Sequence, residues 1–351
     1  MSAALVDTAV EWIERGRVPD AAVRAGIRRL CEARRARETG GDCEARLARE
    51  RAFVAAMDAG PVAPVPEKAN EQHYELPPEF FTRVLGHRLK YSACLFADPA
   101  GGLDAAEDAA LAATCAHAGL ADGQQILELG CGWGSLTLWM AARYPGSRIT
   151  AVSNSAPQRA FIEARAAERG LDNVQVLTAD MNAFAPPGGP YDRVVSVEMF
   201  EHMRNWRVLL ARIATWLKPG GRLLVHVFCH RECPYEFVPE GSSDWMARHF
   251  FTGGIMPSDG LMLRFQDHLR AVDQWRWSGR HYEATANAWL ANLDRHADAL
   301  RPVLEATYGA QAERWLQRWR VFFMACAELF GLRGGEQWWV VHHLLERPAD
   351  A

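Results

Sequence analysis

The feature that most constrains this 351-residue chain is a short apolar segment that runs directly into a cluster of glycines. Residues 126–129 read Ile-Leu-Glu-Leu, Gly130, Gly132 and Gly134 follow at alternate positions, and an apolar helical pattern covers 135–143. A strand that delivers a glycine turn to the start of a helix is typical of nucleotide-binding α/β domains, because glycine lets the backbone turn tightly and a ligand approach closely. The loop lacks the Gly-Lys-Ser/Thr sequence, which excludes a P-loop.

Two acidic residues strengthen the interpretation of this loop as a ligand site. Glu128 stands two residues before the first glycine, and Asp180 follows the third predicted strand, where it can accept a hydrogen bond from an adenine amino group. The alternative is a tight turn between packed elements. With both acids in place, the sequence favours a nucleotide-like ligand.

Strands and helices alternate around this loop, which predicts a doubly wound α/β fold with a mostly parallel sheet. Strands are expected at residues 125–129, 148–152, 174–177, 193–197, 222–227 and 338–345, and helices at 135–143, 156–169 and 206–217.

Three further segments flank the α/β pattern. We expect a helical N-terminal extension over 1–60, a Pro-rich linker over 61–69, and the main domain over 70–351, of which 232–335 is rich in aromatic residues and mostly helical. Six arginines and one acid lie between residues 24 and 37. The pattern favours a solvated helix face over contact with an acidic partner or a membrane surface.

Composition excludes several classes of protein. Thirty-nine basic and 43 acidic residues give a net charge of −4, so bulk electrostatic capture of nucleic acid is not expected. Apolar runs fall short of the roughly 20 residues of a membrane span, and the first residues lack the pattern of a signal peptide. The eight cysteines lack metal-binding spacing, so we expect reduced thiols, a cytoplasmic protein and no metal site.

Residues 128–134 resemble motif I of class I S-adenosylmethionine-dependent methyltransferases. Longer strings are similar to the cyclopropane fatty acid synthase superfamily, and within it to the coclaurine N-methyltransferase-like branch. The superfamily strings are His73-Tyr74-Glu75-Leu76-Pro77, Lys90-Tyr91-Ser92 and Glu198-Met199-Phe200-Glu201-His202. The branch strings are Phe228-Cys229-His230, Phe250-Phe251-Thr252-Gly253-Gly254 and Trp319-Arg320-Val321-Phe322-Phe323, together with the helical N-terminal extension.

The resemblance implies a class I methyltransferase fold, a Rossmann-like α/β domain with a seven-stranded, mostly parallel sheet, an N-terminal helical cap and a helical lid insertion. The implied cofactor is S-adenosylmethionine, with S-adenosylhomocysteine as product. The cofactor-binding residues that it implies are Tyr91, Ser92, Glu128, Gly130, Gly132, Gly134, Asn154, Gln158, Asp180 and Met181.

The candidate catalytic residues are Glu198, Glu201 and His202, which directly follow a predicted strand and therefore lie at the carboxyl end of the sheet, where ligands of such folds bind. An amine acceptor must be neutral to attack a methyl group. Carboxylates can bind its ammonium form, and a neighbouring histidine can accept the proton. His226, Trp319 and Phe322 are the candidate acceptor-binding residues.

A lipid reaction is the competing hypothesis. Cyclopropane synthases that resemble this chain use a bound bicarbonate, held partly by a Cys after Tyr-Ser, and usually have Gly where Glu198 stands. Here Ala93 takes the place of that Cys, and Cys94 comes one residue later. His226 matches a bicarbonate-site histidine of the superfamily, which keeps the lipid reaction open.

We therefore predict N-methylation of a small or medium amine. The alternatives are a cyclopropane or methyl-branched fatty acyl phospholipid synthase and a cofactor-binding protein without catalysis. The expected partner is a small-molecule amine, or a lipid in the alternative, and not a nucleic acid. A homodimer and a monomer both remain open.

Overall fold

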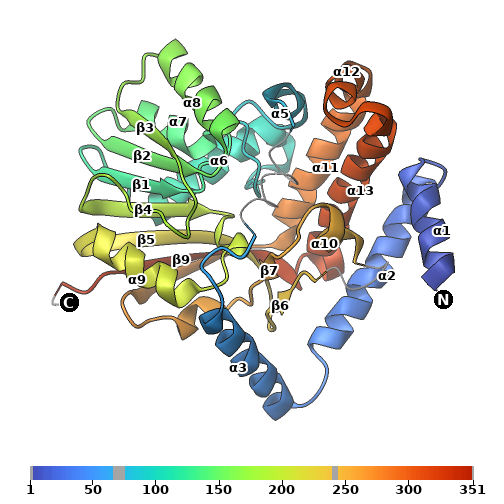
Figure 1. Ribbon diagram of the computed structural model, residues 1–351, viewed down its shortest axis with the longest axis horizontal. Coiled ribbons are helices and arrows are strands. Elements are labelled where there is room, and N and C mark those ends of the chain that lie inside the picture. The colour runs from blue at the N-terminus through green and yellow to red at the C-terminus, as the bar shows by residue number, and fades with distance from the viewer. Residues whose placement is uncertain (1–2, 66–75, 239–243, 350–351) are drawn as a thin grey trace.

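A seven-stranded sheet forms the centre of the computed structural model, which describes residues 3–65, 76–238 and 244–349 (Figure 1). Its strands are β1 Gln125–Leu129, β2 Arg148–Ser153, β3 Val174–Thr178, β4 Tyr191–Val197, β5 Leu217–His230, β8 Arg270–Trp277 and β9 Trp338–Glu346. Their spatial order is β3-β2-β1-β4-β5-β9-β8. Neighbours among the first five strands in this order pair in parallel, and β9 is antiparallel to both β5 and β8. The predicted seven-stranded, mostly parallel sheet is confirmed.

The sequence pattern located six of the seven strands. It did not single out β8, because half of the residues of this edge strand are polar and only its last residue is buried, so it lacks a buried alternation. Strand β5 is also longer than the predicted 222–227. It begins at Leu217, crosses Pro219, and continues to His230, where it still pairs with β9.

Helices cover both faces of the sheet, as alternate side chains of the strands require. The helices that directly cover it are α6 Gly102–His117, α7 Ser135–Arg143, α8 Ala156–Glu168 and α9 Trp206–Trp216. In β1, Ile126 packs in the cluster that contains residues of α6 and α7, whereas the next residue, Leu127, packs in the cluster that contains residues of α9. Side chains of Ser155 and Asn205 cap the first turns of α8 and α9.

A second group of helices lies beside the carboxyl end of the strands (Figure 1). It comprises α5 Pro78–Val84, α10 Trp245–His249, α11 Gly279–Arg295, α12 Ala297–Tyr308 and α13 Ala312–Gly331. The paired strands β6 Tyr235–Glu236 and β7 Ile255–Met256 accompany them, and short 3₁₀ turns cover Pro99–Gly101, Phe200–His202, Leu261–Arg264, Gly309–Gln311 and Leu332–Gly334. Aromatic side chains fill the interior of this group. Trp319, for example, contacts Phe80, Phe250 and Phe322.

Three N-terminal helices, α1 Ala3–Glu14, α2 Asp20–Glu38 and α3 Cys43–Ala59, run around the outside of these two layers (Figure 1). Arg24 and Arg28 of α2 form ion pairs with Glu328 of α13 at 2.8 and 2.7 Å. The arginine run was expected to be a solvated face. Its first members instead attach α2 to the rest of the chain, since Arg24 is mostly buried against its partner.

The described part of the Pro-rich linker is packed rather than free. Ala63 exchanges two hydrogen bonds with the side chain of Asn182 at 2.8 and 2.9 Å, and the carbonyl of Val62 accepts from the backbone N–H of Arg204 at 2.7 Å. Residues 66–69 of the predicted linker, and residues 73–75 of the first superfamily string, lie outside the described residues.

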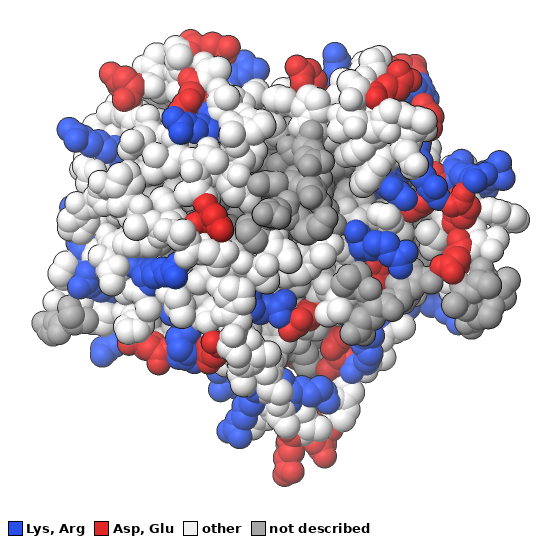
Figure 2. Space-filling model, viewed as in Figure 1, with Lys and Arg blue, Asp and Glu red and all other residues white. Residues whose placement is uncertain are grey.

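The charged side chains of the viewed face are of both signs and lie interspersed, mostly around its rim (Figure 2). This distribution agrees with the near balance of acids and bases in the composition. Within the described ranges, every helix is too short or too polar to span a bilayer.

Candidate active site

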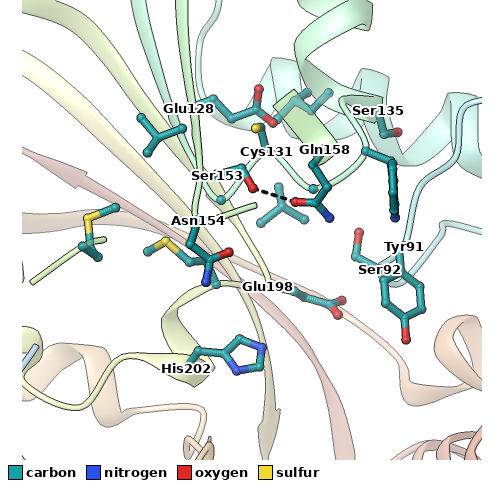
Figure 3. A pocket seen from close by; sticks show the side chains of 18 of the residues that line it. Tyr91, Ser92, Glu128, Cys131, Ser135, Ser153, Asn154, Gln158, Glu198 and His202 are labelled. Carbon is teal, nitrogen blue, oxygen red and sulfur yellow. Dashed lines mark hydrogen bonds between the residues drawn. The ribbon is translucent and has the colours of Figure 1, made fainter. Parts of the chain in front are cut away.

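A pocket opens where the loops that follow β1, β2, β3 and β4 meet (Figure 3). Nine of the ten predicted cofactor residues line it: Tyr91, Ser92, Glu128, Gly130, Gly132, Asn154, Gln158, Asp180 and Met181. The topology explains this convergence, because the carboxyl ends of neighbouring parallel strands meet at one edge of the sheet.

Two glycines of the loop serve different purposes. Gly132 has a φ of +51°, and a Cβ at this position would meet no protein atom within 4 Å, so the space beside it is open. A Cβ at Gly134 would lie 2.6 Å from the Ile162 side chain of α8. Gly134 does not line the pocket, and its lack of a side chain lets α7 and α8 pack closely.

Glu128 is buried beneath the glycine loop and accepts a hydrogen bond from the Thr137 hydroxyl of α7 at 2.5 Å. Burial raises the pKa of Glu128 to about 8, against the opposing effect of the Thr137 hydrogen bond. A buried carboxyl of this kind gains from a cationic ligand group beside it, because a nearby positive charge favours the ionised form.

Buried polar groups of Gln158 and Ser135 lack a partner within the described residues. The Gln158 carbonyl accepts from the Ser153 hydroxyl at 2.6 Å, but its amide nitrogen is unpaired. The hydroxyl of Ser135 is also unpaired, and both residues line the pocket (Figure 3). Because buried polar groups are nearly always hydrogen-bonded in folded proteins, these two fit a pocket that receives a polar ligand.

The segment before α6 reaches the pocket through Tyr91 and Ser92. The ammonium of Lys90 donates to the Ser92 hydroxyl and to the Ala93 carbonyl, both at 2.6 Å. Lys90 is itself buried, and this burial lowers the pKa of its ammonium. The contacts hold the segment against the carboxyl edge of the sheet.

Glu198 carries the densest set of contacts in the pocket. Its Oε1 accepts the backbone N–H of Ala93 at 2.8 Å and lies 3.2 Å from His226 Nε2, and its Oε2 accepts the Tyr282 hydroxyl at 2.7 Å. Its backbone has a φ of +47°, which is strained for a residue with a side chain. Burial raises the pKa of Glu198, while Lys90, the Ala93 N–H and Tyr282 oppose the rise.

His202 and Glu201 occupy different positions relative to the pocket. His202 lines it and lies near Glu198 (Figure 3). Burial lowers the pKa of His202 to about 4, so its imidazole is neutral at neutral pH. Glu201 is fully buried and does not line the pocket; its Oε1 accepts the backbone N–H of Phe228 at 2.9 Å. Burial and the neighbouring Glu198 raise the pKa of Glu201 well above its usual value.

The three predicted acceptor-binding residues do not line this pocket. His226 lies behind it, in contact with Glu198, and Trp319 and Phe322 lie in the aromatic interior of the helical group. Sequence reasoning also missed Tyr282, which contacts Glu198 from α11. No local signal marks that tyrosine, because only the packing of α11 brings it to the site.

The profile of the mycolic acid cyclopropane synthetase family matches residues 65–338. This chain belongs to the mycolic acid cyclopropane synthetase family. The predicted superfamily resemblance is thereby confirmed.

Proteins that are similar to the chain include plant N-methyltransferases. (S)-Coclaurine N-methyltransferase of Thalictrum flavum subsp. glaucum is 38% identical over 286 residues, which cover 80% of this chain and 79% of that protein. The enzyme of the same name from Papaver somniferum is 33% identical over 339 residues, 95% of this chain and 96% of its own. A crystal structure of coclaurine N-methyltransferase bound to N-methylheliamine and S-adenosylhomocysteine superposes with a TM-score of 0.94 at 35% identity, covering 98% of this chain and 100% of that one.

Proposed function

We propose that this chain transfers a methyl group from S-adenosylmethionine to the nitrogen of a small or medium amine. Its similarity to coclaurine N-methyltransferase extends over nearly the whole chain in sequence and in structure. One observation in the pocket carries the choice of an amine over a lipid, and it concerns the environment of Glu198.

In the related lipid enzymes, the resemblance implies that bicarbonate is held by a Cys at the position of Ala93 and by the histidine that matches His226. Ala93 and Glu198 depart from those enzymes, whereas His226 matches them, and in the structure the three residues meet at one point. Glu198 Oε1 contacts both the Ala93 N–H and the His226 imidazole. This arrangement supports a reaction in which the chain supplies a carboxylate of its own in place of a bound bicarbonate.

The pocket fits S-adenosylmethionine. The open space beside Gly132, the unpaired amide of Gln158 and the unpaired hydroxyl of Ser135 suit a polar ligand that approaches the backbone closely. Asp180, whose carboxylate accepts the N–H of Asn182 at 2.9 Å, is held where an adenine amino group can bind. When bound, this cofactor supplies an electrophilic methyl group on a sulfonium.

The chain's own residues orient the acceptor and remove its proton. Glu198 provides a negative charge that binds an ammonium group, while Tyr282 and the Ala93 N–H fix the direction of its carboxylate. His202 is neutral and can accept a proton. Holding the amine in line with the methyl group accounts for much of the catalysis in such a transfer, because positioning replaces a bimolecular encounter.

A panel of acceptors tests the proposal. The enzyme is incubated with methyl-labelled S-adenosylmethionine and either amines, with heliamine as the first probe, or vesicles of unsaturated phospholipid. We expect label in the amine product, with a rate that is unchanged when bicarbonate is removed. Label in the lipid only, with a strict requirement for bicarbonate, would establish the alternative reaction.

We also propose a cytoplasmic location, supported by the free thiols of all eight cysteines, which suit a reducing compartment. The oligomeric state, monomer or homodimer, is tested by light scattering on the purified enzyme.

A further inference from the structure

Three histidines form a line that leads from the active-site carboxylate to the outside of the α/β layer. We propose that His226, His342 and His117 are a proton relay, which carries the proton released in the pocket from Glu198 to the solvent at the end of α6. This inference rests on the proposed amine methylation, because each transfer to an ammonium acceptor releases one proton in a buried site.

Each group in the line lies within about hydrogen-bond distance of the next. Glu198 Oε1 lies 3.2 Å from His226 Nε2, His226 Nδ1 lies 2.8 Å from His342 Nε2, and His342 Nδ1 lies 2.8 Å from His117 Nδ1. His226 and His342 are each fully buried, and His117 is partly exposed near the end of α6. Each buried imidazole uses both of its nitrogens, one toward the pocket and one toward the surface.

The register of the sheet creates this alignment. His226 of β5 and His342 of β9 are directly paired in the antiparallel ladder, so their side chains lie on the same face. Trp275 and Trp277 of β8 flank them. The ring of Trp275 stacks on His117 with centroids 4.0 Å apart, and the ring of Trp277 lies 4.4 Å from His342. These rings shield the relay from water and hold the imidazoles in position, and a ring face also favours a transient cation.

The electrostatic surroundings keep the relay neutral at rest. Burial lowers the pKa of His226 and of His342 well below the usual value, and the nearby Lys90 ammonium acts in the same direction. Burial also lowers the pKa of His117, which Asp273 of β8 partly opposes. The charge of His343, on the opposite face of the sheet, would lower the pKa of His342, and the hydroxyl of Tyr282 faces the relay and donates to Glu198. A neutral imidazole can accept a proton at one nitrogen while it releases another from the second nitrogen.

The transfer balances in atoms. His202 takes the proton of the acceptor and passes it to the neighbouring Glu198, which gives it to Nε2 of His226, and the Nδ1 proton of His226 passes to Nε2 of His342. The Nδ1 proton of His342 passes to Nδ1 of His117, which releases its Nε2 proton to water. One proton enters and one leaves. Each imidazole is neutral before and after the transfer and has changed to its other tautomer.

Kinetics of three variants test the relay. The first variant is His342→Gln, because glutamine can form hydrogen bonds but cannot accept a proton at one atom while releasing another from a second atom. The second is His117→Ala, at the accessible end of the line. His343→Gln is the matched control, since His343 is the next residue on β9, is equally buried and points to the opposite face.

With heliamine as acceptor, we expect kcat of His342→Gln and of His117→Ala to fall at least about 10-fold. The upper limit is the ~10⁴-fold loss that removal of a general base can cause. The affinity for S-adenosylhomocysteine should not change, and added imidazole should partly restore His117→Ala. We expect His343→Gln to retain the wild-type kcat. Wild-type rates in both relay variants, or equal losses in all three variants without rescue, would overturn the relay.

Nitrogen-15 NMR of the histidine rings separates this inference from the proposed function. One hydrogen lies between His226 Nδ1 and His342 Nε2. If His226 carries it, His342 must hold its own proton on Nδ1; if His342 carries it, His226 must hold its own on Nε2. Two neutral imidazoles therefore have the same tautomer, both Nδ1–H or both Nε2–H. We expect both to be neutral at pH 7 and of one tautomer. An imidazolium at either position, or two different tautomers, would refute the relay even if amines are methylated. If no amine is methylated, the proposed function fails, whereas the NMR result separately tests the hydrogen-bonded line of histidines.

Discussion

Single residues of the pocket are specialised by their surroundings rather than by their type. Glu128, Glu198 and Glu201 are all buried glutamates, and burial raises the pKa of each. Their partners differ: Glu128 contacts a hydroxyl of α7, Glu198 faces the pocket among three donors, and Glu201 contacts a backbone N–H. Gly132 differs from all three because it has no side chain and so leaves open the space beside the backbone.

The Gly132→Val variant should lose S-adenosylhomocysteine binding, because the branched side chain would fill the space that the ligand needs. Gly170→Val is a matched control. Gly170 also has a positive φ, of +64°, and a Cβ there would likewise meet no atom within 4 Å, but it lies outside the pocket. Both variants should be strained by a similar amount, since both place a β-branched residue in the left-handed region. Calorimetry checks the result, and near-wild-type affinity in folded Gly132→Val would refute the assignment of the loop.

The His202→Ala variant should lower kcat by about 10²- to 10⁴-fold with little change in cofactor affinity, if this imidazole accepts a proton from the acceptor. Glu201→Gln should lower it less, because Glu201 does not line the pocket, and burial and Glu198 raise its pKa and so favour the neutral carboxyl, which glutamine resembles. Because the pKa of His202 is about 4, an increase of wild-type activity between pH 6 and 9 would reflect deprotonation of the acceptor and should persist in His202→Ala. Steady-state kinetics across pH measure this, and full turnover in both variants at neutral pH would contradict the catalytic roles.

At the scale of elements, α6 connects the pocket to the rest of the fold through its buried face. Glu107 of this helix accepts the backbone N–H groups of Gly86, Arg88 and Lys90 at 3.0, 2.6 and 3.1 Å. It therefore fixes the loop that leads directly into Tyr91 and Ser92. The carboxyl end of the same helix carries His117, so α6 contributes both to the shape of the pocket and to the proposed relay.

The Glu107→Gln variant should weaken cofactor binding without touching the cofactor. The amide of glutamine would place an N–H₂ donor against backbone N–H donors, so at least one of the three hydrogen bonds is lost. A hydrogen bond to a charged group contributes about 1.5–3 kcal/mol to the free energy of unfolding. We expect a lower free energy of unfolding and a higher Kd for S-adenosylhomocysteine. Asp108→Asn, which changes the next residue of α6 and its ion pair with Arg88, should leave the Kd unchanged. An unaltered Kd in Glu107→Gln would show that the loop is held by other contacts.

At the scale of the whole molecule, ion pairs attach the N-terminal helices to the layer that surrounds the pocket. Glu14 of α1 accepts from Arg314 and Arg318 of α13 at 2.6 and 3.0 Å, and α3 reaches α9 through Asp58 and Arg207 at 3.1 Å. Helices α1 and α2 thus support α13, whose aromatic side chains pack against α5 and against Phe250, the residue that follows α10.

The Glu328→Gln variant should loosen α2, because it removes the ionic partner of both Arg24 and Arg28. Partly exposed ion pairs contribute little, so we expect a loss of about 1 kcal/mol in the free energy of unfolding. Limited proteolysis should also cut the N-terminal helices faster. Glu305→Gln, at an exposed position of α12, serves as the control and should show neither effect. Equal proteolysis of the two variants would mean that apolar packing alone holds α2.

The sequence by itself determined the α/β fold, most of the strands and nine of the ten predicted residues that line the pocket. These depend on local signals: an apolar strand, glycines at alternate positions, and polar residues directly after strands, which parallel topology collects at one edge. Only the tertiary structure decided which side chains surround Glu198. Tyr282, His342 and His117 are far from it in sequence, and the register of β5 against β9 and the packing of α6 and α11 bring them into line. Such contacts leave no periodic or local pattern, because each residue looks like an ordinary core or surface position until the chain has folded.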